Sequence, residues 1–184
     1  AILMNRELMD KKQLMVIEKY TQPFVQLVFE KGEQDLVFEK LTQIKGIFEE
    51  TGLANFLAHI GVEDEEKAKS LRLFQPSDSQ LLDHLIEVVI LNHREALFYD
   101  IVTICLDQIQ LLSNAFVVTV TTVAGLDPVQ EQKLIPIIER KFGIQVRSIQ
   151  QKIDPDLIGG FVVTANHKTL DTSLKHQLQV INLN

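Results

Sequence analysis

The side chains that most often bind metals or act as nucleophiles are few and scattered in this sequence. It contains five histidines and a single cysteine, Cys105. His84 and His93 lie nine residues apart, as do His167 and His176. A zinc-binding HExxH helix instead places its two histidines four residues apart. Cys105 sits in an apolar helical pattern that predicts a buried thiol. We therefore predict neither a metal site nor a cofactor.

Two adjacent glycines, Gly159 and Gly160, raise a second possibility, because glycine-rich loops cradle phosphates. In "LIGGFVV" the pair leads into a β-branched run, not into a helix whose N-terminus could hold phosphate. We therefore predict a structural role for both glycines, which let a strand bend. Asp154 and Asp156 flank Pro155, which indicates a turn more than a metal-binding motif. With no G-x-S-x-G motif either, the sequence predicts no enzyme.

The composition is that of a folded chain with two electrostatically different halves. The 184 residues are 46% hydrophobic and carry a formal net charge of -7. Residues 1–112 hold 11 Lys and Arg against 19 Asp and Glu, a balance of -8, and residues 113–184 hold 7 against 6, a balance of +1. This contrast favours two domains. Neither half has the dense basic stripe that binding to a phosphate backbone needs, so we expect no nucleic-acid partner.

The sequence also bears on membranes and compartment. No apolar run approaches the roughly 18 residues needed to cross a bilayer, and acidic side chains interrupt the densest segment, residues 81–112. We expect no direct membrane insertion. The single cysteine offers no disulfide framework, and no secretory signal is recognisable, with Met4 taken as the native start. These features predict a cytoplasmic protein.

Up to residue 112 the sequence predicts one helix after another. Apolar residues recur at spacings of three and four, which is typical of amphipathic helices. Gly32, Gly52, Gly61 and the segment "QPSDSQ" separate the periodic stretches. Short connections are typical of an antiparallel bundle. We therefore predict a six-helix bundle over residues 4–112, with helices at 14–29, 36–48, 53–59, 65–74, 81–91 and 97–112.

After Asn114 the period changes. The run "AFVVTVTTV" is β-branched and predicts a strand. A helix follows, with Asp127 as its N-cap, Pro128 as its first residue and Gln130 near the capping-box position. Gly143 closes that helix. Residues 113–184 are thus predicted to form a small β-α-β-β-α domain, with strands at 115–123, 144–153 and 157–165 and helices at 127–143 and 170–183.

Two helices of the bundle carry more apolar surface than a core-facing helix needs. At about 100° per residue, the apolar positions within 14–29 and those within 81–91 each wrap about 260° of their helix. A stripe of about 100° or somewhat more is enough to face a core. Either both helices pack tightly at the centre of the bundle, or part of each lines a groove for an amphipathic partner helix. Periodicity alone leaves both readings open.

One stretch, "IDPDLIGGFVVTANHKTLDTSLKHQL", joins several features in order. They are an acidic turn, an apolar pair, two glycines, a β-branched strand, a second turn, and an Asp with small residues that opens a helix. The combination resembles the delta subunit of bacterial F-type ATP synthase, the family of the mitochondrial oligomycin-sensitivity-conferring protein. "YTQPFVQLVFEKG", "LNHREALFYDI" and "VTTVAGLDPVQEQKLIPIIERKFG" extend the resemblance over nearly the whole chain. Pro23, His93 and Glu95 depart from the family's usual residues, and we expect Pro23 to bend the first helix.

The resemblance implies a non-catalytic stator subunit in the peripheral stalk of F-type ATP synthase. Such a subunit links the alpha-beta catalytic head to the b subunits and resists rotation, which enables proton-driven ATP synthesis or ATP-driven proton pumping. The bundle would bind the N-terminal helix of an alpha subunit in a groove between its first and fifth helices. Residues 113–184 would bind the C-terminal region of the b subunit. The implied place is the cytoplasmic face of the bacterial plasma membrane.

Candidate contact residues follow from this role, although a place in the core is the alternative for each. For the alpha-subunit groove we predict apolar side chains of the first and fifth helices: Tyr20, Phe24, Leu27, Leu85, Val88 and Val89. For the b subunit we predict side chains of the last strand and helix: Phe161, Val163, Leu174 and Leu178. Two other classes are weighed against the stator. A helical adaptor of another cytoplasmic complex would not bind an alpha N-terminus, and an enzyme would need a pocket with clustered titratable groups.

Overall fold

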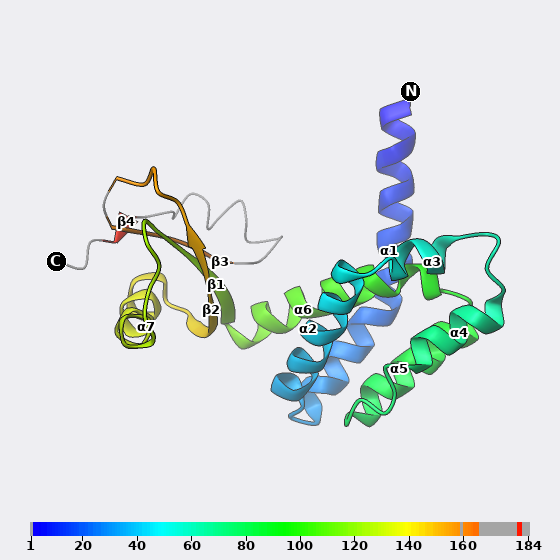
Figure 1. Ribbon diagram of the computed structural model, residues 1–184. Helices are drawn as coiled ribbons and strands as arrows, with labels where there is room; N and C mark the ends of the chain where they lie inside the picture. Colours follow the sequence, from blue (N-terminus) through cyan, green and yellow to red (C-terminus); the bar gives the residue numbers. More distant parts are fainter. Residues whose placement is uncertain (1, 159, 166–179, 182–184) are drawn as a thin grey trace. The chain divides into compact units, whose positions relative to one another are not determined.

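The computed structural model describes residues 2–158, 160–165 and 180–181. The chain divides into two compact units, Ala1–Ile109 and Gln110–Asn184, and each is described by itself (Figure 1). Unit 1 consists of helices. Unit 2 contains a small mixed sheet and a helix, so the predicted fold class, mainly α followed by α/β, is confirmed.

Short connections join the helices of unit 1. They are α1 (Ile2–Glu30), α2 (Gln34–Glu50), α3 (Leu53–Ala58), α4 (Asp64–Arg72), α5 (Gln80–Leu91), the 3-10 turn η1 (Glu95–Leu97) and α6 (Phe98–Ser113), whose residues from Gln110 onward belong to unit 2. Each helix predicted from the apolar spacing is present. The prediction for α1 was too short, because this helix begins twelve residues before Leu14. Its early residues lack core spacing but include Leu, Lys, Met and Glu, which favour helices intrinsically.

The end of α1 shows how local chemistry sets the helix boundaries. Gly32 has a φ of 67°, a left-handed conformation that favours glycine. Its N–H donates to the carbonyl of Phe29, and the N–H of Glu33 donates to the carbonyl of Val28. These two bonds satisfy carbonyls that the last turn of α1 would leave unpaired. Pro23 lies inside α1 and is exposed, and the helix continues through it.

The core of unit 1 is apolar and includes one aromatic cluster. The rings of Phe48, Phe74, Phe98 and Tyr99 lie with centroids 5.4 to 6.4 Å apart. Among the described residues, one helical segment, 95–113, is long and apolar enough to cross a membrane by length and composition alone. Helices in the core of soluble proteins meet the same criterion. Its inward side chains are fully buried in the bundle: Phe98, Ile101, Val102, Cys105 and Ile109.

Unit 2 is built around the strand β1. β1 (Ala115–Thr122) pairs in parallel with β2 (Gln145–Ile153), and α7 (Pro128–Phe142) connects them. On its other side β1 pairs with β3 (Phe161–Ala165) in antiparallel fashion, and β3 pairs with β4 (Val180–Ile181). The strand order is therefore β2-β1-β3-β4.

The predicted boundaries of α7 are confirmed. Asp127 accepts a hydrogen bond from the N–H of Gln130 at 2.8 Å, and the side chain of Gln130 accepts one from the N–H of Asp127 at 2.9 Å. This reciprocal pair is a capping box. Gly143 ends α7 with a φ of 65°. The inner face of α7, with Leu134 and Ile138, completes the core of unit 2 against alternate side chains of β1.

The predicted last helix, residues 170–183, is wrong at its two described positions. Val180 and Ile181 form β4 and pair with Val162 and Phe161. Both are β-branched residues, which suit an extended strand at the side of a sheet. Residues 170–179, 182 and 183 lie outside the described residues.

Candidate functional site

The predicted groove lies along α1 and α5, which contact each other in unit 1. Two hydrogen bonds define how these helices run. The amide of Asn92, just after α5, donates to the hydroxyl of Tyr20 at 3.0 Å. At the other end, the hydroxyl of Ser79, just before α5, donates to the carboxylate of Glu33 at 2.7 Å. Since Tyr20 precedes Glu33 and Ser79 precedes Asn92, the two helices are antiparallel.

The two bonds are separated by the same number of residues on both sides of the pair. Tyr20 and Glu33 are 13 residues apart, as are Ser79 and Asn92. At about 1.5 Å per residue this corresponds to about 20 Å along α5, whereas on the other side α1 ends at Glu30, so only about 15 Å of the segment that begins at Tyr20 is helix. The pair is thus held in one register over a length that matches a short partner helix.

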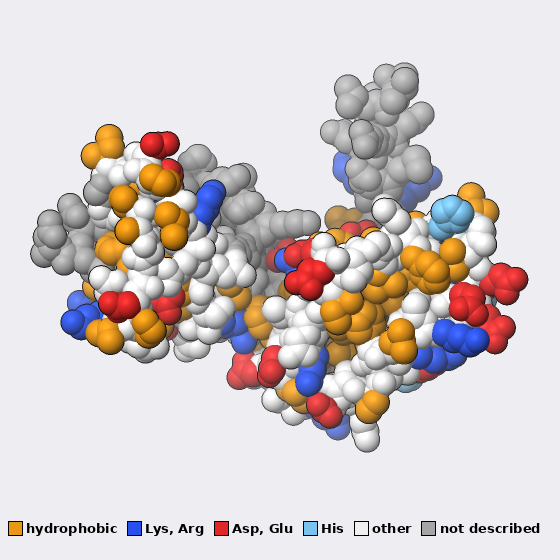
Figure 2. Space-filling model, viewed as in Figure 1, with side chains coloured by type: hydrophobic (Ala, Val, Ile, Leu, Met, Phe, Trp, Pro, Cys, Tyr) orange, Lys and Arg blue, Asp and Glu red, His pale blue; other side chains and the backbone are white. Residues whose placement is uncertain are grey.

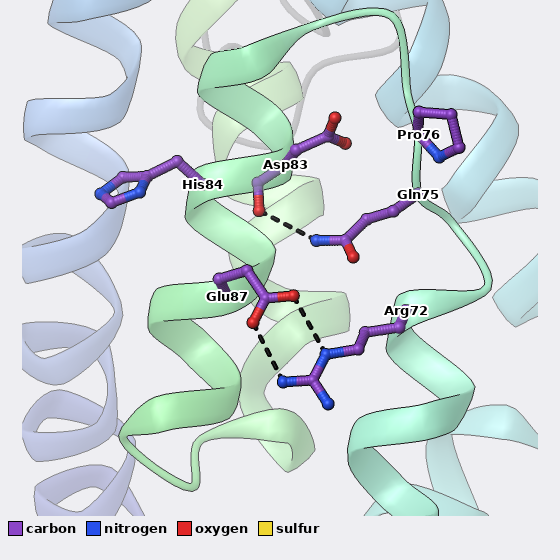
Figure 3. Close-up of a pocket in the computed structure, with 6 residues that line it drawn as sticks. All are labelled: Arg72, Gln75, Pro76, Asp83, His84 and Glu87. Carbon is purple, nitrogen blue, oxygen red and sulfur yellow. Dashed lines mark hydrogen bonds and ion pairs between the residues drawn. The ribbon is translucent and has the colours of Figure 1, made fainter.

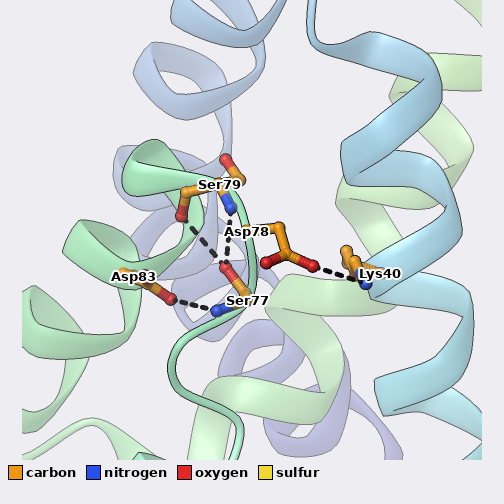
Figure 4. A network of polar contacts seen from close by, with 5 residues as sticks. All are labelled: Lys40, Ser77, Asp78, Ser79 and Asp83. Atoms are coloured by element: carbon orange, nitrogen blue, oxygen red, sulfur yellow. Dashed lines mark hydrogen bonds and ion pairs between the residues drawn. The ribbon is translucent and has the colours of Figure 1, made fainter.

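The start of α5 is fixed by a network of polar contacts (Figure 4). The hydroxyl of Ser79 accepts a bond from the N–H of Leu82 at 3.2 Å, which makes Ser79 the N-cap. The N–H of Ser77 donates to the carboxylate of Asp83 at 3.0 Å. Asp78 forms an ion pair with Lys40 of α2 at 3.2 Å. These contacts tie the first turn of α5 to the bundle.

The predicted groove residues divide by burial. Phe24, Leu85 and Val89 are 5%, 6% and 0% exposed, so in this structure they belong to the core of unit 1. Tyr20 and Val88 are partly buried, and Leu27 is 42% exposed. The accessible part of the predicted set therefore consists of Tyr20, Leu27 and Val88.

Sequence reasoning missed two side chains on the same stripe of α5. His84, Val88 and Leu91 follow the i, i+4, i+7 spacing, which aligns them along one face. Leu91 is 76% exposed. Figure 3 shows His84 extending from α5 toward the ribbon of α1, away from Arg72. The signal that could have found them is the stripe that continues from Val88 in both directions.

A shallow polar pocket lies between α4 and α5, lined by Arg72, Gln75, Pro76, Asp83, His84 and Glu87 (Figure 3). The guanidinium of Arg72 donates two bonds to the carboxylate of Glu87, both at 3.0 Å. The bonds from Arg72 hold the pKa of Glu87 below its ordinary value. The amide of Gln75 donates to the carbonyl of Asp83 at 3.1 Å. These groups hold α4 against α5. We therefore interpret the pocket as a gap at a contact between helices and not as a reaction site.

Two observations concern the residues that could act as nucleophiles or metal ligands, within the part of the chain that the structure describes. Burial raises the pKa of the Cys105 thiol well above its ordinary value, so the reactive thiolate is scarce. Among the described residues, no three His, Cys, Asp or Glu side chains meet in an arrangement that could hold a metal ion.

The residues predicted for the b subunit are only partly described. Val163 is 4% exposed and belongs to the core of unit 2, whereas Phe161 is partly buried. Leu174, Leu178 and Gly159 lie outside the described residues. Gly160 has a φ of 71°, in the left-handed region that favours glycine, directly before β3.

Comparisons with known proteins converge. A family model described as ATP synthase delta (OSCP) subunit matches residues 16–184. The ATP synthase subunit delta of Streptococcus sanguinis is 62% identical over 173 residues, which cover 94% of this chain and 97% of that protein. The protein of the same name from Streptococcus pneumoniae is 49% identical over 176 residues, covering 96% and 99%. A chain in the cryo-EM structure of the Toxoplasma gondii mitochondrial ATP synthase hexamer shares the fold, with a TM-score of 0.58 at 15% identity and coverage of 91% and 89%.

Proposed function

The chain belongs to the ATP synthase delta (OSCP) family, and we propose that its α1–α5 groove binds the N-terminal helix of an alpha subunit. As a member of this family the chain is a non-catalytic stator subunit of F-type ATP synthase, associated with the F1 head and the peripheral stalk. It belongs to a membrane-associated complex as a peripheral component.

The observation that carries the proposed groove is the antiparallel pair of α1 and α5. Apolar side chains remain accessible along the part of this pair that the two hydrogen bonds, Ser79–Glu33 and Asn92–Tyr20, hold together. Leu27 on α1 and Leu91 on α5 are exposed, and Tyr20 and Val88 are partly so. Figure 2 shows hydrophobic side chains gathered on the visible face of unit 1. Such a surface fits the apolar face of an amphipathic helix. The buried residues Phe24, Leu85 and Val89 would lie beneath this surface. They pack in the core of unit 1 and would support the accessible side chains without touching the partner helix themselves.

A stator joint must outlast many catalytic steps, so its dissociation must be slow. Nanomolar affinity, about -12 kcal/mol, is a reasonable requirement. Burying one Leu or Val side chain contributes about 1.5–3 kcal/mol. Leu27, Val88 and Leu91, which are only partly exposed to begin with, would together with Tyr20 supply part of this, on helices already held in register.

For unit 2 we propose binding to the C-terminal region of the b subunit. The candidate residues remain Phe161, Val163, Leu174 and Leu178, with Val163 acting through the core that it fills. In this arrangement the chain connects the alpha-beta head to the stalk and resists rotation. We place it at the cytoplasmic face of the bacterial plasma membrane.

The test is calorimetric titration of the full chain with a peptide of the cognate alpha-subunit N-terminus. We expect tight one-to-one binding. Leu91→Asp should weaken it at least tenfold, because a charge would enter the apolar contact. Leu73→Asp is the matched control, since Leu73 is an 84% exposed leucine at the C-cap of α4 and belongs to neither α1 nor α5. Equal binding by both variants and the unchanged chain would refute the groove.

A further inference from the structure

The carboxyl ends of β1 and β2 meet at one end of the sheet of unit 2. The strands are parallel, with Thr122 opposite Ile153. The N–H of Asp154 donates to the carbonyl of Thr122 at 2.8 Å. A Cβ added to Gly125 would lie 3.7 Å from the Cδ1 of Ile153. Segments 123–129 and 153–158, far apart in the sequence, therefore lie side by side (Figure 1).

Hydrogen bonds hold these segments in a defined shape. The side chain of Gln151 accepts from the N–H of Leu126 at 2.7 Å and donates to the carbonyl of the same residue at 2.9 Å. It also donates to the carboxylate of Glu131 at 2.7 Å. The hydroxyl of Thr122 accepts from the N–H of Gly125 at 2.7 Å. A surface built on such loops is preorganised, so a partner would lose little free energy in ordering it.

This end of the sheet exposes apolar side chains, which we call the carboxyl-end patch: Val123, Val129, Ile153 and Ile158. Their exposed fractions are 42%, 62%, 58% and 97%. A single exposed apolar side chain is ordinary, but several at one end of a small domain indicate an interaction surface. Figure 2 shows hydrophobic side chains gathered on the visible face of unit 2.

The rim of the patch is acidic within a domain that is otherwise basic. Segments 122–131 and 151–158 contain four acidic residues against Lys152 alone, a balance of -3. The rest of residues 113–184 holds six Lys and Arg against two acidic residues, a balance of +4. Asp127 already caps the N-terminus of α7 with its own carboxylate. The patch is therefore suited to an apolar partner with positive flanks, and not to an anion.

We propose that the carboxyl-end patch docks a helical segment of the b subunit whose apolar stripe is flanked by Lys or Arg. The inference rests on the proposed function of unit 2 and assigns that contact to a different surface. The apolar stripe covers Ile153 and Ile158, and the basic flank lies against the acidic rim at Asp156. Val163, predicted earlier, supports the surface only from the core.

The experiment titrates the full chain with the soluble part of the cognate b subunit. We expect Ile153→Asp and Ile158→Asp each to weaken binding about tenfold or more. Each substitution removes an apolar side chain that would become buried in the complex. Asp156→Lys should slow association and reduce its dependence on salt. Leu112→Asp is the matched control. Leu112 is a 67% exposed leucine that precedes β1, about 26 Å from the patch at about 3.3 Å per strand residue.

The outcomes separate the two proposals. If the unchanged chain does not bind the b subunit, the proposed function of unit 2 fails and the docking surface fails with it. If the unchanged chain binds and the two isoleucine variants bind equally well, only the patch is refuted. The patch is also refuted if Leu112→Asp weakens binding as much as they do. Selective loss in the isoleucine variants, with unchanged melting curves, supports it.

Discussion

Removal of the Ser79 hydroxyl should weaken both the start of α5 and its attachment to α1. Ser79 is 1% exposed, and its hydroxyl makes two bonds. It accepts from the N–H of Leu82 at 3.2 Å and donates to the carboxylate of Glu33 at 2.7 Å. Ser79→Ala deletes both without adding bulk. The groove then loses one of the two bonds that set the register of its helices.

The size of the effect follows from these two bonds. Loss of an N-cap hydroxyl costs about 0.5–2 kcal/mol of stability. A hydrogen bond to a charged group contributes about 1.5–3 kcal/mol. Glu33 is partly exposed, so water can replace its lost partner and the second figure falls to the low end. We expect Ser79→Ala to lower the free energy of unfolding of unit 1 by about 2–3 kcal/mol.

Tyrosine fluorescence during urea unfolding measures this quantity. The chain has no tryptophan and two tyrosines, Tyr20 and Tyr99, which both lie in unit 1. The signal therefore reports on the bundle even where unit 2 unfolds separately. A shift of the midpoint at unchanged slope gives the change in stability. Ser70→Ala is the control, because its hydroxyl bonds only within α4, to the carbonyl of Lys67.

A double-mutant cycle with Glu33→Ala isolates the contact between the helices. We expect a coupling energy of about 1 kcal/mol between Ser79 and Glu33. Additive effects of the two substitutions would show that this bond does not contribute. A midpoint for Ser79→Ala equal to that of Ser70→Ala would refute the reasoning for both bonds.

Two further predictions follow from the pKa shifts. The pKa of Glu87 is lowered by its bonds from Arg72, so this pair stabilises the fold above the ordinary pKa of 4.5, and the contribution is lost as pH falls through the lowered value. Glu87→Gln should remove that part of the acid dependence in melting curves; because the pair is exposed the change should be small, and an unchanged acid limb would contradict the assignment. Burial raises the pKa of Cys105, so an aromatic disulfide reagent at mildly alkaline pH should react with it only after urea unfolding. Rapid labelling of the folded chain would show that the thiol is accessible.

The sequence predicts those features of the fold that depend on local chemistry. Gly32 ends α1 because its left-handed conformation suits glycine, and Asp127 with Gln130 begins α7 because their side chains pair with the free N–H groups of the first turn. The helices in between follow from apolar spacing. Val180 and Ile181 were misassigned because a helical period in a short segment does not account for a neighbouring strand that can pair with it.

The candidate site was harder to predict, because an apolar side chain looks the same in a core and in a groove. Phe24 and Leu27 are both apolar and lie on one helix, yet they are 5% and 42% exposed. This difference in exposure depends on which neighbouring helix packs against each face of α1. The spacing of apolar residues in the sequence does not carry that information. Ile158 was missed for another reason: the sequence predicts a strand over 157–165 that would include it, whereas β3 begins only at Phe161 and Ile158 lies in the segment before it. Its exposure becomes visible only once β2 and β3 are placed.

The two bonds that pin α1 to α5 also bear on how fast a partner can leave. Glu33–Ser79 and Tyr20–Asn92 fix the register at both ends of about 15 Å of paired helix, from Tyr20 to the end of α1 at Glu30. A groove held this way exists before its partner arrives, so less binding energy is lost in ordering it. This smaller ordering cost makes binding more favourable. Since most differences in affinity between related complexes appear in the dissociation rate, we expect a slower dissociation. Ser79→Ala should therefore shorten the lifetime of the alpha-peptide complex, although Ser79 itself need not touch the peptide.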